Sequence, residues 1–216
     1  LEWCIAMEGS APFKTVVSCE TGFDASAIIG LAKQYFSEGV EEYHYYQWKG
    51  KKTWPIPQNW AWQRAARQMA KLGAPWLWWE SDAIPVRAGW LGEFQKEYLE
   101  KAKPFMGAWV TTNGNRPYMA GVGIYPANVA QYCTSAFTCQ SVAFDIEMGP
   151  YISRHHAATS LIYHNIAPVT FNKTHKLNEI PETAVLVHKC KDGTLIEKLL
   201  NKTEPEPEQP SPKKTI

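Results

Sequence analysis

The sequence predicts an α/β fold, a single domain in which helices flank a mainly parallel central sheet. Two observations predict it. Short runs rich in β-branched and aromatic residues alternate with longer runs whose apolar residues recur at helical spacing. FKTVVS, at residues 13–18, also has the density of β-branched residues that is typical of a buried strand. A chain of 216 residues can bury one sizeable core but is short for two.

The first half of the chain predicts helices and strands in alternation. Asp24 is a plausible N-cap, because the residues after it carry apolar side chains at helical spacing. The prolines of KGKKTWPIP, residues 49–57, block regular strand pairing and predict a loop, and Gly73 ends the helix that follows. The predicted elements are a helix at 1–8, a strand at 13–18, a helix at 24–37, a strand at 41–48 and a helix at 58–73.

The second half continues this alternation and ends in a polar tail. Residues 201–216 are rich in Pro, Glu and Lys and have almost nothing to bury, so we expect a disordered tail after a domain formed by residues 1–200. The predicted elements are a strand at 76–79, a helix at 89–102, strands at 105–110 and 118–126, a helix at 127–137, and strands at 144–148 and 183–187.

Composition excludes several classes of protein. The formal net charge of +1 gives no overall electrostatic attraction to nucleic acid or to a membrane. Five cysteines without any C-x-x-C spacing suggest neither a disulfide framework nor a zinc knuckle, and favour a reducing compartment. No apolar run reaches the roughly 18 residues of a membrane span, and LEWCIAMEG lacks the features of a signal peptide. We therefore expect a cytoplasmic protein that does not associate with membranes.

Two carboxylates follow the most apolar strand, in PWLWWESDAIPVRAGW at residues 75–90. In open α/β sheets, ligands bind outside the carboxyl ends of the strands, where Glu80 and Asp82 are expected to lie. Two acids so close repel each other and are costly beside an apolar strand unless they are neutralised. A divalent cation such as Mg²⁺ or Mn²⁺ would do so and would keep positions for phosphate. Capping of the next turn, or pairing with Arg87, is the alternative interpretation.

The Glu-Ser-Asp at residues 80–82, followed by Ala-Ile-Pro and Gly-Trp-Leu, resembles the D-x-D motif of family 2-like glycosyltransferases with the Rossmann-like GT-A fold. The closest resemblance is to small enzymes of tailed bacteriophages. Glu80 in place of the first Asp is a departure that leaves Asp82 as the surer metal ligand. Further segments fit the same resemblance, in the same order along the chain: 54–66 with Asn59, YMAGVGIYP at 118–126, FDIEM at 144–148, and HKCKDGTLI from His188.

The resemblance implies a metal-dependent transfer of a sugar from a nucleoside diphosphate donor, with a UDP-sugar expected. Asp82 would hold Mn²⁺ or Mg²⁺, and His188 would complete the coordination. Lys189 and Lys191 would meet the phosphates, because ammonium groups and a dication together stabilise the charge that develops on the departing diphosphate. His164, in SLIYHN, is a rival ligand. A histidine satisfied at a strand end is the alternative interpretation of His188.

The nucleoside of the donor is expected at the end of the first strand. The aromatic loop 48–54 could cover the base, although ordinary packing also explains tryptophans. Asn59 could be only a helix N-cap. Gln58 and Arg64 are further candidates for contact with the diphosphate. The predicted donor-binding residues are Ser18, Cys19, Glu20, Asn59, Glu80, Ser81, Lys189 and Lys191.

Asp145 and Glu147 are the candidates for a general base that takes the proton of the acceptor hydroxyl. They alternate with apolar residues, and in a strand residues two apart share a face, so both carboxylates would point the same way. A solvent-facing acidic pair is the alternative, and both inversion and retention of configuration stay open. The adjacent His155 and His156 diverge in any regular structure and are expected at the surface.

The phage resemblance implies a hydroxymethylated pyrimidine base in DNA as acceptor, and base flipping would then require basic and aromatic groups. Lys49, Lys51, Lys52 and Arg116 could supply the charge, but the nearly neutral chain is unusual for a DNA-binding protein. A carbohydrate or protein acceptor remains open. So does a non-catalytic module that binds a nucleotide-sugar or glycan. A nucleotidyltransferase would need a Gly-rich, Lys-bearing loop after the first strand, which SCETGFD matches poorly.

Overall fold

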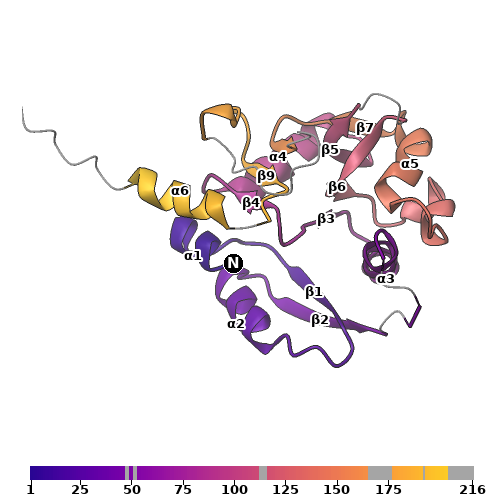
Figure 1. Ribbon diagram of the computed structural model, residues 1–216, viewed down its shortest axis with the longest axis horizontal. Coiled ribbons are helices and arrows are strands. Elements are labelled where there is room, and N and C mark those ends of the chain that lie inside the picture. Colours follow the sequence, from indigo (N-terminus) through magenta and orange to yellow (C-terminus); the bar gives the residue numbers. More distant parts are fainter. Residues whose placement is uncertain (47–48, 51–52, 112–115, 165–176, 192, 204–216) are drawn as a thin grey trace, which may run out of the picture.

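The computed structural model describes residues 1–46, 49–50, 53–111, 116–164, 177–191 and 193–203 (Figure 1). The α-helices are α1 (Glu2–Glu8), α2 (Ser26–Tyr35), α3 (Ile56–Leu72), α4 (Trp90–Lys101), α5 (Phe144–Ile152) and α6 (Thr194–Thr203). The strands are β1 (Thr15–Glu20), β2 (Val40–Tyr45), β3 (Trp76–Trp78), β4 (Ile84–Pro85), β5 (Phe105–Val110), β6 (Tyr118–Tyr125), β7 (His156–Ala158), β8 (Ile162–His164) and β9 (Leu186–His188). Short 3₁₀ helices are η1 (Val129–Gln131), η2 (Ser135–Phe137) and η3 (Leu177–Glu179).

The α/β class is confirmed, but the sheets are mixed, and the predicted mainly parallel central sheet is not found among the described residues. The strands form a parallel pair β1-β2, a four-stranded sheet in the order β3-β6-β5-β7, and a three-stranded sheet in the order β4-β9-β8. Strand β6 is antiparallel to both β3 and β5. Only residues 111–117 connect β5 to β6, which is shorter than the roughly twelve residues of a parallel crossover. The chain therefore turns back.

The core packs on both faces of the four-stranded sheet. On one face, Trp90 and Phe94 of α4 lie in a cluster with alternate residues of β5 and β6. On the other face, Trp62 of α3 stacks on Phe144 of α5, with ring centroids 4.4 Å apart. In Figure 1, β1, β2 and α2 lie together in the lower part of the molecule, below the four-stranded sheet. None of the described helices combines the length and the apolar character that a membrane span requires.

Two predicted elements differ in type. Residues 144–148, predicted as a strand, begin α5, because the buried Phe144, Met148 and Ile152 recur every four residues and form one helical face. Residues 127–137, predicted as one helix, contain only η1 and η2. Ser, Thr and Asn side chains compete with the backbone for hydrogen bonds, and immediately after this segment the Thr138 hydroxyl donates to the carbonyl of Ser135.

Two predicted boundaries also move. Helix α2 begins at Ser26 with Ala25 at the N-cap position, so Asp24 is not the N-cap, although its carboxylate accepts a hydrogen bond from the backbone N–H of Ser26. Helix α6 continues to Thr203, so residues 201–203 are helical rather than part of a tail. The rest of the predicted tail, 204–216, lies outside the described residues. Gly73 ends α3 in a left-handed conformation, as predicted.

The prediction that both adjacent histidines are surface residues is right for one of them. His155 is exposed, whereas His156 is half-buried. The ring Nε2 of His156 lies 3.1 Å from the carbonyl oxygen of Gly107, and the ring packs on Trp109 with centroids 4.5 Å apart. Burial lowers the pKa of His156 to about 4, so this side chain is neutral at neutral pH.

Asn59 joins α3 to the start of α5 and has a structural role that its sequence context does not reveal. Pro55 occupies the N-cap position of α3, and the Asn59 side chain is buried one turn further on. Its amide nitrogen donates to the carbonyls of Cys139 (3.1 Å) and Val142 (2.8 Å). Its oxygen accepts from the backbone N–H of Phe144 at 2.8 Å. The N-cap alternative is therefore wrong, because Pro55 holds that position, whereas the donor-binding role of Asn59 stays a prediction.

The Asn59→Ala variant should lower the free energy of unfolding by about 2–4 kcal/mol, because it leaves one buried N–H and two half-buried carbonyls without these partners. Urea denaturation measures this change. Gln58→Ala is the matched control, because Gln58 is the preceding residue of the same helix and is exposed. Equal effects of the two substitutions would contradict the role given to Asn59.

Candidate metal and phosphate site

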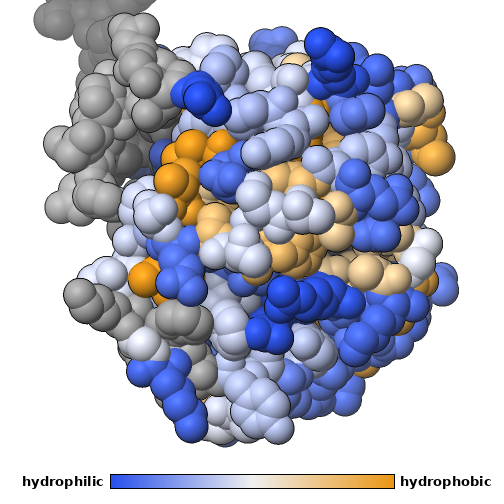
Figure 2. Space-filling model, turned by 90° about the vertical axis from the view of Figure 1, so that its right-hand side faces the viewer, coloured by the Kyte–Doolittle hydropathy of each residue, from blue (hydrophilic) through white to orange (hydrophobic). Residues whose placement is uncertain are grey.

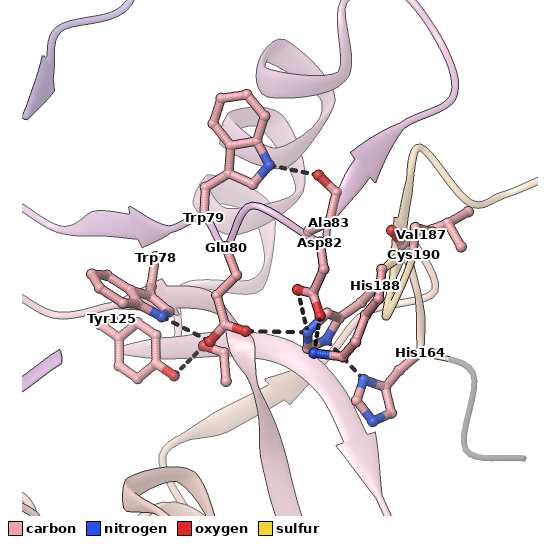
Figure 3. Close-up of polar contacts among 12 residues, drawn as sticks. Trp78, Trp79, Glu80, Asp82, Ala83, Tyr125, His164, Val187, His188 and Cys190 are labelled. Atoms are coloured by element: carbon pink, nitrogen blue, oxygen red, sulfur yellow. Dashed lines mark hydrogen bonds and ion pairs between the residues drawn. The ribbon is translucent and has the colours of Figure 1, made fainter. Parts of the chain in front are cut away.

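The turn after β3 holds the two carboxylates between two sheets. β3 ends at Trp78, and the turn is closed by a hydrogen bond from the backbone N–H of Ala83 to the carbonyl of Glu80 at 3.0 Å. The indole of Trp78 donates to Glu80 Oε1 at 2.9 Å, and the indole of Trp79 donates to the Ala83 carbonyl at 2.8 Å (Figure 3). The apolar strand therefore supplies both the burial of the turn and the donors that hold it.

Strand β9 brings His188 to this turn from the C-terminal part of the chain. Immediately after the turn, β4 pairs antiparallel with β9, with Ile84 opposite Val187. Beyond β9, the backbone N–H of Cys190 donates to the carbonyl of Asp82 at 2.8 Å. These bonds fix His188 beside Asp82 although more than a hundred residues separate them.

Glu80, Asp82 and His188 form a cluster that could hold a metal ion. His188 Nε2 lies 3.3 Å from Glu80 Oε2 and 3.4 Å from Asp82 Oδ1, and one ligand atom from each residue lies within 4.8 Å of the others. Two carboxylates and an imidazole suit a divalent cation that keeps open positions for water or phosphate. The sequence predicted that Asp82 and His188 act together, and the structure places them side by side (Figure 3).

The charges of the cluster are balanced within the protein. Burial would raise the pKa of Asp82, but hydrogen bonds from His188 and Lys191 hold it well below its ordinary value. Burial would lower the pKa of His188, but its hydrogen bonds to Asp82 and Glu80 raise it instead. Lys191 Nζ lies 2.8 Å from Asp82 Oδ2. Arg87 contacts Glu93 rather than the cluster, so the alternative interpretation with Arg87 as partner is wrong.

His164 lies behind His188 rather than among the carboxylates. The Nδ1 atoms of the two rings are 2.9 Å apart. Burial, the charge of His188 and that of Lys189 lower the pKa of His164 to about 3, so His164 is neutral. Its Nδ1 can then accept the Nδ1–H of His188, which leaves His188 Nε2 directed at Glu80 and Asp82. His164, predicted as a rival ligand, is instead positioned to orient the ligand.

Of the two predicted general bases, only Asp145 joins the cluster. A Cβ atom added to Gly121 of β6 would lie 2.9 Å from Glu80 Oε1 and 3.8 Å from Asp145 Oδ2, so both carboxylates lie over this glycine. Burial raises the pKa of Asp145 to about 6, and the charge of Glu80 acts in the same direction. Glu147 belongs to the same helix, two residues and about 200° further round, and its charge acts on the thiol of Cys139. The prediction that the two acids share a face is wrong.

Gly121 was missed by the sequence analysis, although its signal was present. Glycine inside a strand often indicates that another group approaches the backbone closely, and YMAGVGIY contains two. Here the approaching group is the carboxylate of Glu80.

The predicted nucleoside-binding residues lie at the end of β1, as expected, where β1 pairs with β2. The hydroxyl of Ser18 is buried without a hydrogen-bond partner among the described residues. Cys19 Sγ lies 3.5 Å from His44 Nδ1, and the charge of Glu20 helps to raise the pKa of the Tyr45 phenol. The donor-binding roles of these residues stay predictions.

The remaining predicted contacts are partly outside the described residues. Ser81 is exposed in the turn, and Lys189, in a left-handed conformation, acts electrostatically on His164. Arg64 lines a pocket that contains no residue of the cluster. Lys49, Trp54, Gln58 and Arg116 are exposed. Trp48, Lys51 and Lys52 lie outside the described residues.

Comparison of this chain with protein-family models, with curated proteins and with solved structures finds no match. The geometry of the site therefore carries the functional argument.

The contact between His164 and His188 predicts a difference between two substitutions at residue 164. Groups that orient a metal-bound histidine commonly contribute 10- to 100-fold to metal affinity, so His164→Leu should weaken Mn²⁺ binding by about 10-fold or more. His164→Asn should retain most of the affinity, because its side-chain oxygen can replace Nδ1 as acceptor. Isothermal titration calorimetry with Mn²⁺ measures the affinity of both variants. Urea denaturation shows whether the two variants are equally stable. Equal losses in the two variants would show that the contact does not orient His188.

Proposed function

We propose that this protein is a metal-dependent glycosyltransferase of the GT-A type, which transfers a sugar from a nucleoside diphosphate to a hydroxyl group. The observation that carries the proposal is the cluster of Glu80, Asp82 and His188 with the ammonium group of Lys191 against it. A cation site beside an exposed basic side chain, at the end of a strand, suits a diphosphate. Asp145 adds a carboxylate of raised pKa at the same place.

The side chains of the cluster divide the binding of cation and phosphate between them. Glu80 and Asp82 would supply oxygen ligands and His188 a nitrogen ligand, which requires loss of its Nε2 proton. When bound, Mn²⁺ or Mg²⁺ stabilises the negative charge that develops on the departing diphosphate. Lys191, whose side chain is 52% exposed, would be released from Asp82 and could meet the phosphate oxygens.

Asp145 is the residue that favours turnover over binding alone. A carboxylate with a pKa of about 6 is largely ionised at neutral pH and is still basic enough to take a proton from an acceptor hydroxyl as it attacks the anomeric carbon. A module that only binds a nucleotide-sugar or a glycan has no need for such a group. Asn59 contributes indirectly, because it holds Phe144 at the start of the helix that carries Asp145.

The donor and acceptor follow from the sequence resemblance. A UDP-sugar is the expected donor, and the hydroxyl of a hydroxymethylated pyrimidine in DNA is the expected acceptor, with a carbohydrate or protein hydroxyl as the alternative. A base inside a duplex would have to be flipped out to reach Asp145.

Metal-dependent binding of a nucleoside diphosphate is the first test. In a thermal-shift panel, UDP and UDP-sugars should raise the melting temperature by about 5–10 °C at a hundred times their Kd, when Mn²⁺ is present. EDTA should remove this shift, and so should Asp82→Asn. Asp24→Asn is the matched control, because Asp24 is exposed and its hydrogen bonds join it to Ser26. If no nucleoside diphosphate shifts the wild-type protein, the proposed function is wrong.

Turnover distinguishes the two acids of α5. Asp145→Asn should keep the shift with donor and Mn²⁺ but lower the rate of diphosphate release by about 10²- to 10⁴-fold, the usual contribution of a general base. Glu147→Gln is the control on the same helix and should keep the wild-type rate. Release of UDP from a UDP-sugar, with water as acceptor, measures both. A rate that is unchanged in Asp145→Asn would exclude Asp145 as the base.

A further inference from the structure

A second site is lined by basic and aromatic side chains on α3. The pocket has a volume of about 230 Å³ and lies between α3 and residues 137–140. None of its lining residues belongs to the carboxylate cluster. Figure 2 views the side of the molecule that carries α3 and α5, and shows strongly hydrophilic side chains bordering an apolar strip. The residues on which the argument depends are Trp60, Arg64, Arg67, Phe137 and Gln140.

The two arginines of this pocket lack an anionic partner within the parts of the chain that the structure describes. The described lining contains no Asp or Glu, and no ion pair involves Arg64 or Arg67 there. The Nε of Arg64 is buried without a hydrogen-bond partner among the same residues. Burial and the charge of Arg67 both lower the pKa of Arg64, which means that its cationic form is destabilised. A bound anion would offset this cost.

Aromatic rings hold both guanidinium groups in place. The Cζ atom of Arg64 lies 3.7 Å from the ring centroid of Trp60, and that of Arg67 lies 5.4 Å from the ring centroid of Phe137. Trp60 is itself fixed, because its indole donates to the carbonyl of Tyr46 at 2.7 Å. A guanidinium stacked on a ring leaves its N–H edge available for an acceptor. The two arginines are therefore preorganised to bind an anion.

We propose that this pocket binds a phosphate group. Phosphate oxygens match the forked N–H groups of arginine, and Gln140, which lines the same pocket, is a further candidate donor. The group could belong to a small phosphate compound or to the backbone of a nucleic acid, which share this chemistry. The site is independent of the carboxylate cluster and does not rest on the proposed sugar transfer.

Phosphate binding is measured in EDTA, where the carboxylate cluster has no cation. The probes are inorganic phosphate, followed by calorimetry, and a single-stranded oligothymidylate, followed by fluorescence anisotropy. Arg64→Gln and Arg67→Gln should each weaken phosphate binding by about 10-fold, the value of one charge-assisted hydrogen bond. Lys71→Gln removes the same charge from an exposed position on α3 and should leave binding unchanged. The urea midpoint of each variant shows whether it is folded. Arg67 is exposed, so Arg67→Gln should change the packing of the protein little.

The two sources of phosphate give different results with the oligonucleotide. If the ligand is a nucleic acid backbone, the oligonucleotide binds and the slope of log affinity against log salt falls by about 0.7 in each arginine variant. If the ligand is a small compound, inorganic phosphate binds and the oligonucleotide does not. The proposal is overturned if neither probe binds saturably, or if the arginine variants behave like Lys71→Gln. Loss of phosphate binding in Asp82→Asn would also overturn it, since the anion would then lie at the cluster.

Discussion

The pairing of β4 with β9 is the interaction on which the candidate site depends. The pairing joins Ile84 and Pro85, the two residues after the Glu80–Ala83 turn, to β9. The hydrogen bond from the backbone N–H of Cys190 to the carbonyl of Asp82 extends this contact. Without this contact, two half-buried acids would stand at a strand end with no neutralising group, which is costly. With it, His188 and Lys191 reach the carboxylates. Formation of the site and docking of the C-terminal segment are therefore one event.

The other half of the site depends on the opposite part of the sheet. Strand β6 passes beneath Glu80, and Gly121 leaves the space that its carboxylate occupies. Asn59 of α3 holds the backbone of Phe144, the first residue of α5, and Trp62 of α3 stacks on the Phe144 ring. Asp145 is thus positioned by core packing around α3 rather than by a loop. Its raised pKa follows from the same packing, because burial is the main cause.

The sequence was sufficient where local pattern decides structure. The apolar run that ends at two acids predicted their place at a strand end, and Gly73 predicted the end of α3. It was insufficient where distant contacts decide. The five residues FDIEM alternate in polarity like a strand, and the helical spacing of apolar residues becomes clear only when Ile152 is included. The hydrogen bond that fixes Phe144 comes from Asn59, 85 residues away. The direction of β6 is likewise set by the shortness of the connection before it.

Net charge shows why composition says little about binding in this protein. The total of +1 is a sum over groups that the fold separates, and partly buried charges interact strongly with their neighbours because salt screens them little. The carboxylate cluster contains its own compensation, so a cation must displace a proton from His188 and release Lys191. The arginines on α3 have no such compensation among the described residues, so an anion can bind there without breaking an ion pair. The two sites should therefore respond differently to pH, since binding at the first removes a proton from a side chain of the protein, whereas the arginines of the second stay protonated.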